Sequence, residues 1–137
     1  MSTPTKQVVL FEGTSAADTA FNTGTLNTTG YDAVFVEEQP SGAAAAASIY
    51  LKDMGKGSVS TTVGVIALSA NADPNEIAWG IGVGTAAAAA YYRGGLSAPL
   101  PSSVRFDVGA LGAGITCYLR VIGVRRHRGP DVSLTAD

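Results

Sequence analysis

The stretch Ser102–Arg126 reads SSVRFDVGALGAGITCYLRVIGVRR and holds two segments in which apolar and polar residues alternate. The apolar positions are Val104, Phe106, Val108, Ile115, Cys117, Leu119 and Val121. Alternation with a period of two is typical of a strand with one face in a core. Gly109, Gly112 and Gly114 lie between the segments and can adopt the positive φ angles of a short connection. The stretch therefore predicts an antiparallel hairpin near the centre of an all-β domain.

Other segments have the composition of strands, and turn-forming residues separate them. They are Gln7–Glu12, Tyr31–Glu38, Ala44–Lys52, Ser58–Leu68, Glu76–Thr85 and Ala86–Arg93, which makes about eight strands in all. A long loop, Gly13–Gly30, is a candidate to contact a neighbouring chain. We expect a single domain over residues 1–137, an antiparallel β-sandwich of the jelly-roll or Greek-key type. A flexible arm (1–6) and a flexible tail (129–137) are expected at its ends.

Composition gives the surface an unusual character. The 137 residues carry a net charge of −2, and only 15% of them are charged, whereas about a quarter is usual. Either partners cover part of the surface, or Ser, Thr and Asn supply its polarity. The N-terminus lacks the pattern of a signal peptide, and no apolar run is long enough to span a membrane. We expect a soluble protein that is made in a cytosol.

The residues for catalysis or metal binding are sparse. His127 is the only histidine and Cys117 the only cysteine, which are too few ligands for an ordinary zinc site and exclude an internal disulfide. We expect Cys117 to be a buried small side chain. Glu37 and Glu38 are adjacent, so a strand places them on opposite faces and they cannot act as an acid–base pair. These observations predict a protein that is not an enzyme and has no metal or cofactor.

The segment Glu76–Thr85 suggests a packing face. One side of the expected strand carries large residues, with Trp79 in the core, and the other side is small. The large residues are Ile77, Trp79, Ile81 and Val83, and the small ones are Ala78, Gly80, Gly82 and Gly84. A dinucleotide-binding loop would need a helix after the glycines, and no helix is predicted there. We interpret the small side as a surface that another layer or subunit approaches closely.

The C-terminal part is the second candidate contact region, and it is basic. Its arginines are Arg120, Arg125, Arg126 and Arg128. The chain is acidic overall and has no interleaved aromatic residues there, which argues against nucleic acid and favours docking onto an acidic protein surface or a solvated tail. Ile122 and Val124 continue the outer row of this strand, where a solvated face would stay polar, and so predict cover by another chain.

The small all-β size, the low charge, the Ala-, Gly- and Thr-rich strands and the closing RFDVGALGAGITCYLRVIGVRR together resemble the capsid decoration (cement) proteins of tailed bacteriophages. The resemblance implies a homo-oligomer, commonly a trimer, that binds the major capsid protein on the outer head shell and stabilises neighbouring subunits. It also implies a location on the virion after synthesis in the host cytoplasm. Two alternatives stay open: another virion component, such as a head fibre base or tail protein, and a carbohydrate-binding β-sandwich that uses exposed rings of Tyr91 or Tyr92.

Overall fold

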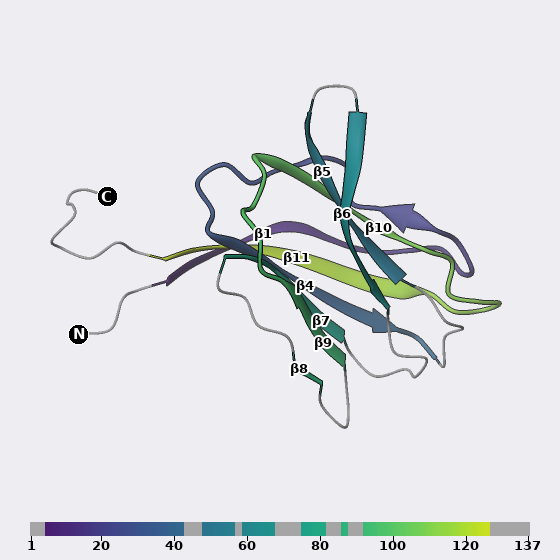
Figure 1. The fold of residues 1–137 in the computed structure, drawn as a ribbon. Coiled ribbons are helices and arrows are strands. Elements are labelled where there is room, and N and C mark those ends of the chain that lie inside the picture. Colours follow the sequence, from purple (N-terminus) through teal and green to yellow (C-terminus); the bar gives the residue numbers. More distant parts are fainter. Residues whose placement is uncertain are drawn as a thin grey trace, which may run out of the picture.

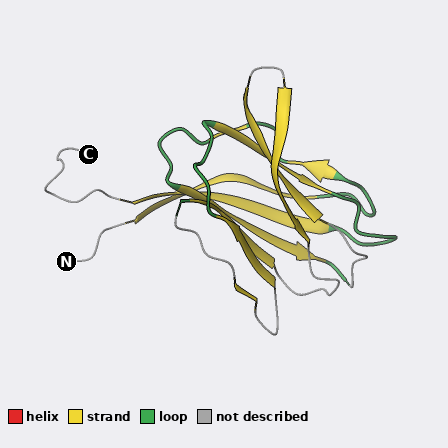
Figure 2. Cartoon of the chain, in the orientation of Figure 1, coloured by secondary structure: helices red, strands yellow, loops and turns green. Residues whose placement is uncertain are grey.

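The described residues form strands and loops and contain no helix (Figure 2). The structure is a computed structural model that describes residues 5–42, 48–56, 59–67, 75–81, 86–87 and 92–126. Its strands are β1 (Thr5–Thr14), β2 (Phe21–Asn22), β3 (Leu26–Asn27), β4 (Ala33–Pro40), β5 (Ser48–Lys56), β6 (Val59–Ala67), β7 (Asn75–Gly80), β8 (Ala86–Ala87), β9 (Tyr92–Leu96), β10 (Ser103–Val108) and β11 (Cys117–Arg126). The predicted all-β class is therefore confirmed for these residues.

The strands belong to two sheets. The six-stranded sheet has the order β1-β11-β4-β7-β9-β8, and the five-stranded sheet has the order β2-β10-β5-β6, with β3 also paired to β10. Figure 1 shows β11, β4, β7 and β9 side by side, with β5, β6 and β10 crossing over them. Both sheets contribute to one cluster of buried apolar side chains.

Alternation decides which side chains enter this cluster. In β11, Cys117, Leu119 and Val121 are fully buried, as the sequence predicted. Trp79 from the six-stranded sheet meets Phe106 from the five-stranded sheet edge to face, with ring centroids 6.1 Å apart. Large rings bury more apolar area than other side chains, so this contact is a principal link between the sheets. The core role predicted for Trp79 is confirmed.

The predicted hairpin between the two segments of residues 102–126 is wrong. β10 pairs with β5, β2 and β3, whereas β11 pairs with β1 and β4, so the two strands lie in different sheets. The connection between them leads from one sheet to the other. Gly112 and Gly114 have φ angles of 115° and 76° there, which only glycine adopts readily. Each strand has one side in the same core, so apolar and polar residues alternate along it just as they would in the two strands of a hairpin.

Two further predictions fail around β7. β7 ends at Gly80, and Ile81, which was predicted to face inward, is 77% exposed. Residues 94–96, which follow the end of the predicted strand Ala86–Arg93, belong to β9, which pairs with β7 in parallel. The sheets are therefore not wholly antiparallel. The described residues form eleven strands instead of the expected eight. The three additional strands, β2, β3 and β8, have only two residues each.

The segments expected to be free are partly held by the chain itself. β1 begins at Thr5, so residues 5 and 6 belong to a strand rather than to an arm. In the loop 13–30, the buried residues Ser15, Thr23 and Thr28 exchange hydrogen bonds with the backbone of β10, of β11 and of the segment before β10. This loop therefore lies on its own chain. The predicted tail, 129–137, is outside the described residues.

Candidate protein-binding face

The outer side of the six-stranded sheet brings together several residues that the sequence singled out. Because Cys117, Leu119 and Val121 point into the core, the residues between and after them in β11 point outward. These outward residues are Tyr118, Arg120, Ile122 and Val124, and all four are half-buried. Ile122 and Val124 thus lie on the outer face, as predicted.

Apolar side chains cross this face from strand to strand. Ile122 lies between Val9 of β1 and Phe35 of β4, and Phe35 lies beside Ala78 of β7. Val9 is 51% exposed, and the other three residues are half-buried. Val124 and Ala33 form the next register row. We call these residues the apolar band: Val9, Ala33, Phe35, Ala78, Ile122 and Val124.

Gly80 does not offer a close approach to another subunit. It is buried opposite Ala33, and a Cβ atom built on it would lie 2.7 Å from the Cβ atom of Ala33 and 2.7 Å from the carbonyl oxygen of Asp32. The small residue at this position therefore makes room for the chain's own β4. The other two glycines of the predicted face, Gly82 and Gly84, are outside the described residues.

A row of charged residues borders the apolar band on one side. The register aligns Glu12, Arg120, Glu37 and Glu76 across β1, β11, β4 and β7. Arg120 donates from Nε to Oε1 of Glu37 over 2.7 Å, and its Nη2 lies 2.5 Å from the same oxygen. This hydrogen bond raises the pKa of Arg120. The face thus presents an apolar strip beside charges that are already partly paired.

The predicted cluster of arginines is divided by the fold. Arg120 lies on the outer face with its charge matched by Glu37, whereas Arg125 is exposed and alternation directs it to the opposite side of β11. Arg126 ends β11 opposite Thr5, and nothing is described of its side chain. Arg128 is outside the described residues. Arg120 and Arg125 therefore do not act as one basic patch.

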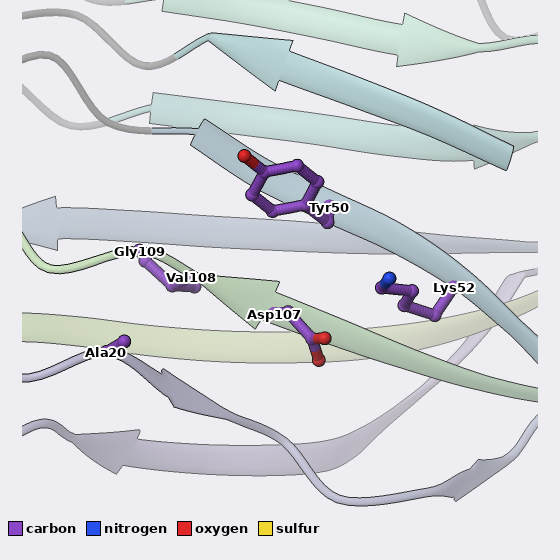
Figure 3. Close-up of a pocket in the computed structure, with 6 residues that line it drawn as sticks. All are labelled: Ala20, Tyr50, Lys52, Asp107, Val108 and Gly109. Atoms are coloured by element: carbon purple, nitrogen blue, oxygen red, sulfur yellow. The ribbon is translucent and has the colours of Figure 1, made fainter. Parts of the chain in front are cut away.

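A shallow hollow of about 310 Å³ opens on the other sheet. It is lined by Tyr50 and Lys52 of β5, by Asp107 and Val108 at the end of β10, and by Ala20 and Gly109 from the adjoining loops (Figure 3). The Lys52 ammonium lies 5.9 Å from the centre of the Tyr50 ring and donates to the Thr62 hydroxyl over 2.6 Å.

The carboxylate of Asp107 is held in place beside the hollow. It accepts two hydrogen bonds from Arg105, at 2.7 Å from Nε and 2.9 Å from Nη2. This hydrogen bonding raises the pKa of Arg105. The hollow therefore combines an exposed aromatic ring with a cation and a fixed carboxylate.

The two adjacent glutamates lie on opposite faces of β4, as predicted. Glu37 is on the outer face, whereas Glu38 is 1% exposed on the inner face and accepts a hydrogen bond from the thiol of Cys117. Cys117 is buried, as predicted. Within the described residues, no three His, Cys, Asp or Glu side chains are grouped closely enough to hold a metal ion.

Sequence reasoning missed Val9, Phe35 and Tyr50. A signal for Phe35 was present, because Ala33–Val36 is apolar at every position and so has no polar side. Tyr50 lies between the buried residues Ile49 and Leu51. Alternation along this strand could therefore have predicted that Tyr50 faces the surface. The rings of Tyr91 and Tyr92, which the sequence offered for sugar binding, are not described.

The described part of the chain has no helix with the length and apolar character needed to cross a membrane. No family model, curated protein or solved structure matches this chain. The site must therefore be interpreted from its own residues.

Proposed function

We propose that this chain is a structural protein that docks onto other protein subunits through the apolar band, in the manner of a capsid decoration protein. The proposed partner is the major capsid protein, and the proposed location is the outer surface of a virion head. Docking would bury the band and so stabilise the neighbouring subunits that it bridges.

The observation that supports this proposal most is the apolar band with its charged border. When the outer face of a sheet meets only water, the apolar residues that face the core usually alternate along each strand with polar residues that face outward. In the apolar band, the outward residues are apolar as well. An apolar centre with a polar rim is the common anatomy of a protein interface. Val9 is 51% exposed, so docking would remove more of its surface from water than that of the half-buried residues of the band.

We also propose the finer fold, a β-sandwich of the jelly-roll type. In a jelly roll, a long hairpin is rolled up so that the first strand pairs with the last and each inner pair follows in turn. Here β1 pairs with β11, β2 with β10, β4 with β7, and β5 with β6. With this assignment, β8 and β9 are an insertion. Jelly rolls include viral capsid and lectin domains, which supports the class of function by analogy only.

The proposal can be tested by sedimentation with head shells of the virus whose genome encodes the chain. The wild type should co-sediment with the shells, and Val9→Lys should weaken binding on the order of tenfold, because a charge would enter the buried band. Thr25→Lys is the matched control, since it adds the same charge at an exposed loop position. No binding by the wild type, or equal loss in both variants, would argue against the proposal.

The hollow beside Tyr50 favours a second candidate function, carbohydrate binding. Tyr50 is 40% exposed, and its ring offers a surface on which a sugar ring can stack. Lys52 can donate to hydroxyl groups and Asp107 can accept from them, and a few such polar groups in a largely apolar hollow usually set ligand orientation.

Titration with glucose, galactose and N-acetylglucosamine, followed by NMR, tests this second function. Binding should shift the signals of Tyr50 and Asp107, and Tyr50→Ala should remove the shifts. Lys56→Ala, at an exposed position further along the same strand, should leave them unchanged. If none of these sugars moves the signals at millimolar concentration, the hollow is not such a site.

A further inference from the structure

β6 forms the outer edge of the five-stranded sheet. It pairs with β5 on one side, and no described strand pairs with it on the other. An edge strand presents unpaired backbone N–H and C=O groups, which are a template for another extended chain. β6 is nine residues long, near the upper end of the usual range for strands in globular proteins.

The usual protection of an edge is weak here. Edges are commonly blocked by Lys or another charge, by Pro or by a bulge. β6, VSTTVGVIA, has neither charge nor Pro, although its pairing with β5 shifts register twice, between Leu51 and Lys52 and between Asp53 and Lys56. The edge of the other sheet, β1, also has a register shift, but it carries Lys6 and Glu12 as well.

Exposed apolar side chains gather at the same edge. Among the described residues, the large exposed hydrophobic side chains are Val9, Tyr50, Val63, Val65 and Ile81. Three of them, Tyr50, Val63 and Val65, lie on β5 and β6, and Tyr50 is paired directly with Val65. The edge thus offers both open hydrogen-bonding groups and apolar area, which together fit an added strand.

We propose that the occupant of this edge is β6 of a second copy of the chain, added in antiparallel orientation. Because β6 carries no charge, pairing with a copy of itself brings no like charges opposite each other. It also has no charged side chain that would favour a strand of opposite charge from another protein. The same contact then serves both copies, so the dimer closes about a two-fold axis. Val63 and Val65 of both copies become covered.

The far end of the β5–β6 hairpin gives this pairing a structural benefit. β10 pairs with β5 only from Ile49 to Asp53, so beyond Asp53 the hairpin pairs only with itself among the described residues. It stands clear of the other strands at the top of the view (Figure 1). Two-stranded ribbons are marginally stable in water, and a strand from a partner would support this one. The two-fold dimer differs from the trimer that the family resemblance implies.

The dimer contact does not depend on the proposed docking function, because β6 and the apolar band lie on different sheets. Light scattering over a range of concentrations tests it without any capsid. The wild type should be a dimer at high concentration, and Val65→Lys should weaken self-association by on the order of tenfold or more. Val9→Lys is the matched control, since Val65 and Val9 are 54% and 51% exposed on edge strands of the two sheets.

Hydrogen exchange of the wild type gives a second measurement that needs no variant. Amide protection along β6 should rise with protein concentration, while protection along β1 should not. A monomer at every concentration, a trimer that Val65→Lys leaves intact, or equal weakening by Val9→Lys would overturn the proposal. In contrast, failure to bind head shells by a protein that still dimerises would count only against the docking function.

Discussion

The thiol of Cys117 donates a hydrogen bond to Oε2 of Glu38 over 3.0 Å, on the inner face of the six-stranded sheet. Cys117 is fully buried and Glu38 is 1% exposed. Burial raises the pKa of the Cys117 thiol, and the hydrogen bond to Glu38 raises it further. The thiol therefore stays protonated in the folded protein well above the pH at which an exposed thiol ionises.

Cys117 should be unreactive in the native protein. The thiolate is the reactive form, and here both ionisation and access are suppressed. At pH 8, labelling by a thiol reagent should be more than about tenfold slower than in urea-unfolded protein. Absorbance of the released reagent group measures both rates. Rapid labelling of protein that retains its native circular dichroism would contradict this burial.

The same pair makes stability depend on alkaline pH. The ordinary pKa of the thiol is 9.0, and it is higher in the folded state. Above pH 9 the unfolded chain therefore loses a proton that the folded chain keeps, so the free energy of unfolding falls as pH rises, by at most about 1.4 kcal/mol per pH unit. Below about pH 8 this contribution is constant.

Cys117→Ser is the control for the alkaline effect, because a hydroxyl can still donate to Glu38 and does not titrate in this range. Urea unfolding at pH 7 to 10.5 should give curves that are parallel at neutral pH and diverge above pH 9, with the wild type losing more stability. Parallel curves throughout would mean that the folded thiol ionises normally.

Much of the fold could be predicted from alternation. The pattern in residues 103–108 and 117–121 identified the strands and their buried sides, because a strand with one face in a core must alternate. Pairing could not be read in the same way. Alternation tells which side of a strand faces the core but not which strand lies beside it, so two strands on opposite sheets looked like a hairpin.

The link between the sheets should dominate stability. Phe106→Ala removes the ring that meets Trp79, and a large-to-small change of this kind costs about 3–5 kcal/mol. Trp79→Phe should cost less, under about 2 kcal/mol, since it keeps a ring and removes an indole N–H that has no hydrogen-bond partner among the described residues. Urea unfolding of both variants measures the two costs. A loss for Trp79→Phe as large as that for Phe106→Ala would contradict this expectation.

The candidate site was only partly predictable. Ile122 and Val124 were found because an outer row turned apolar. On β4, Phe35 lies between Ile122 and Ala78, and Ala33 lies beside Val124. Gly80 was misinterpreted, because a small residue in a strand indicates close approach without telling what approaches. The neighbour is β4 of the same chain, a relation that only the sheet order reveals.

Gly80→Ala separates these two interpretations. A Cβ atom at this position would lie 2.7 Å from the backbone oxygen of Asp32, which cannot move as freely as a side chain, so the variant should lose about 1–3 kcal/mol of stability. Gly109→Ala is the matched control, because no atom lies within 4 Å of its added Cβ, and its stability should change by less than about 0.5 kcal/mol. Thermal or urea unfolding of the isolated protein measures both. If Gly80→Ala keeps full stability and loses only the ability to dock, then Gly80 faces a partner, and the close packing against Asp32 and Ala33 is not what requires a glycine.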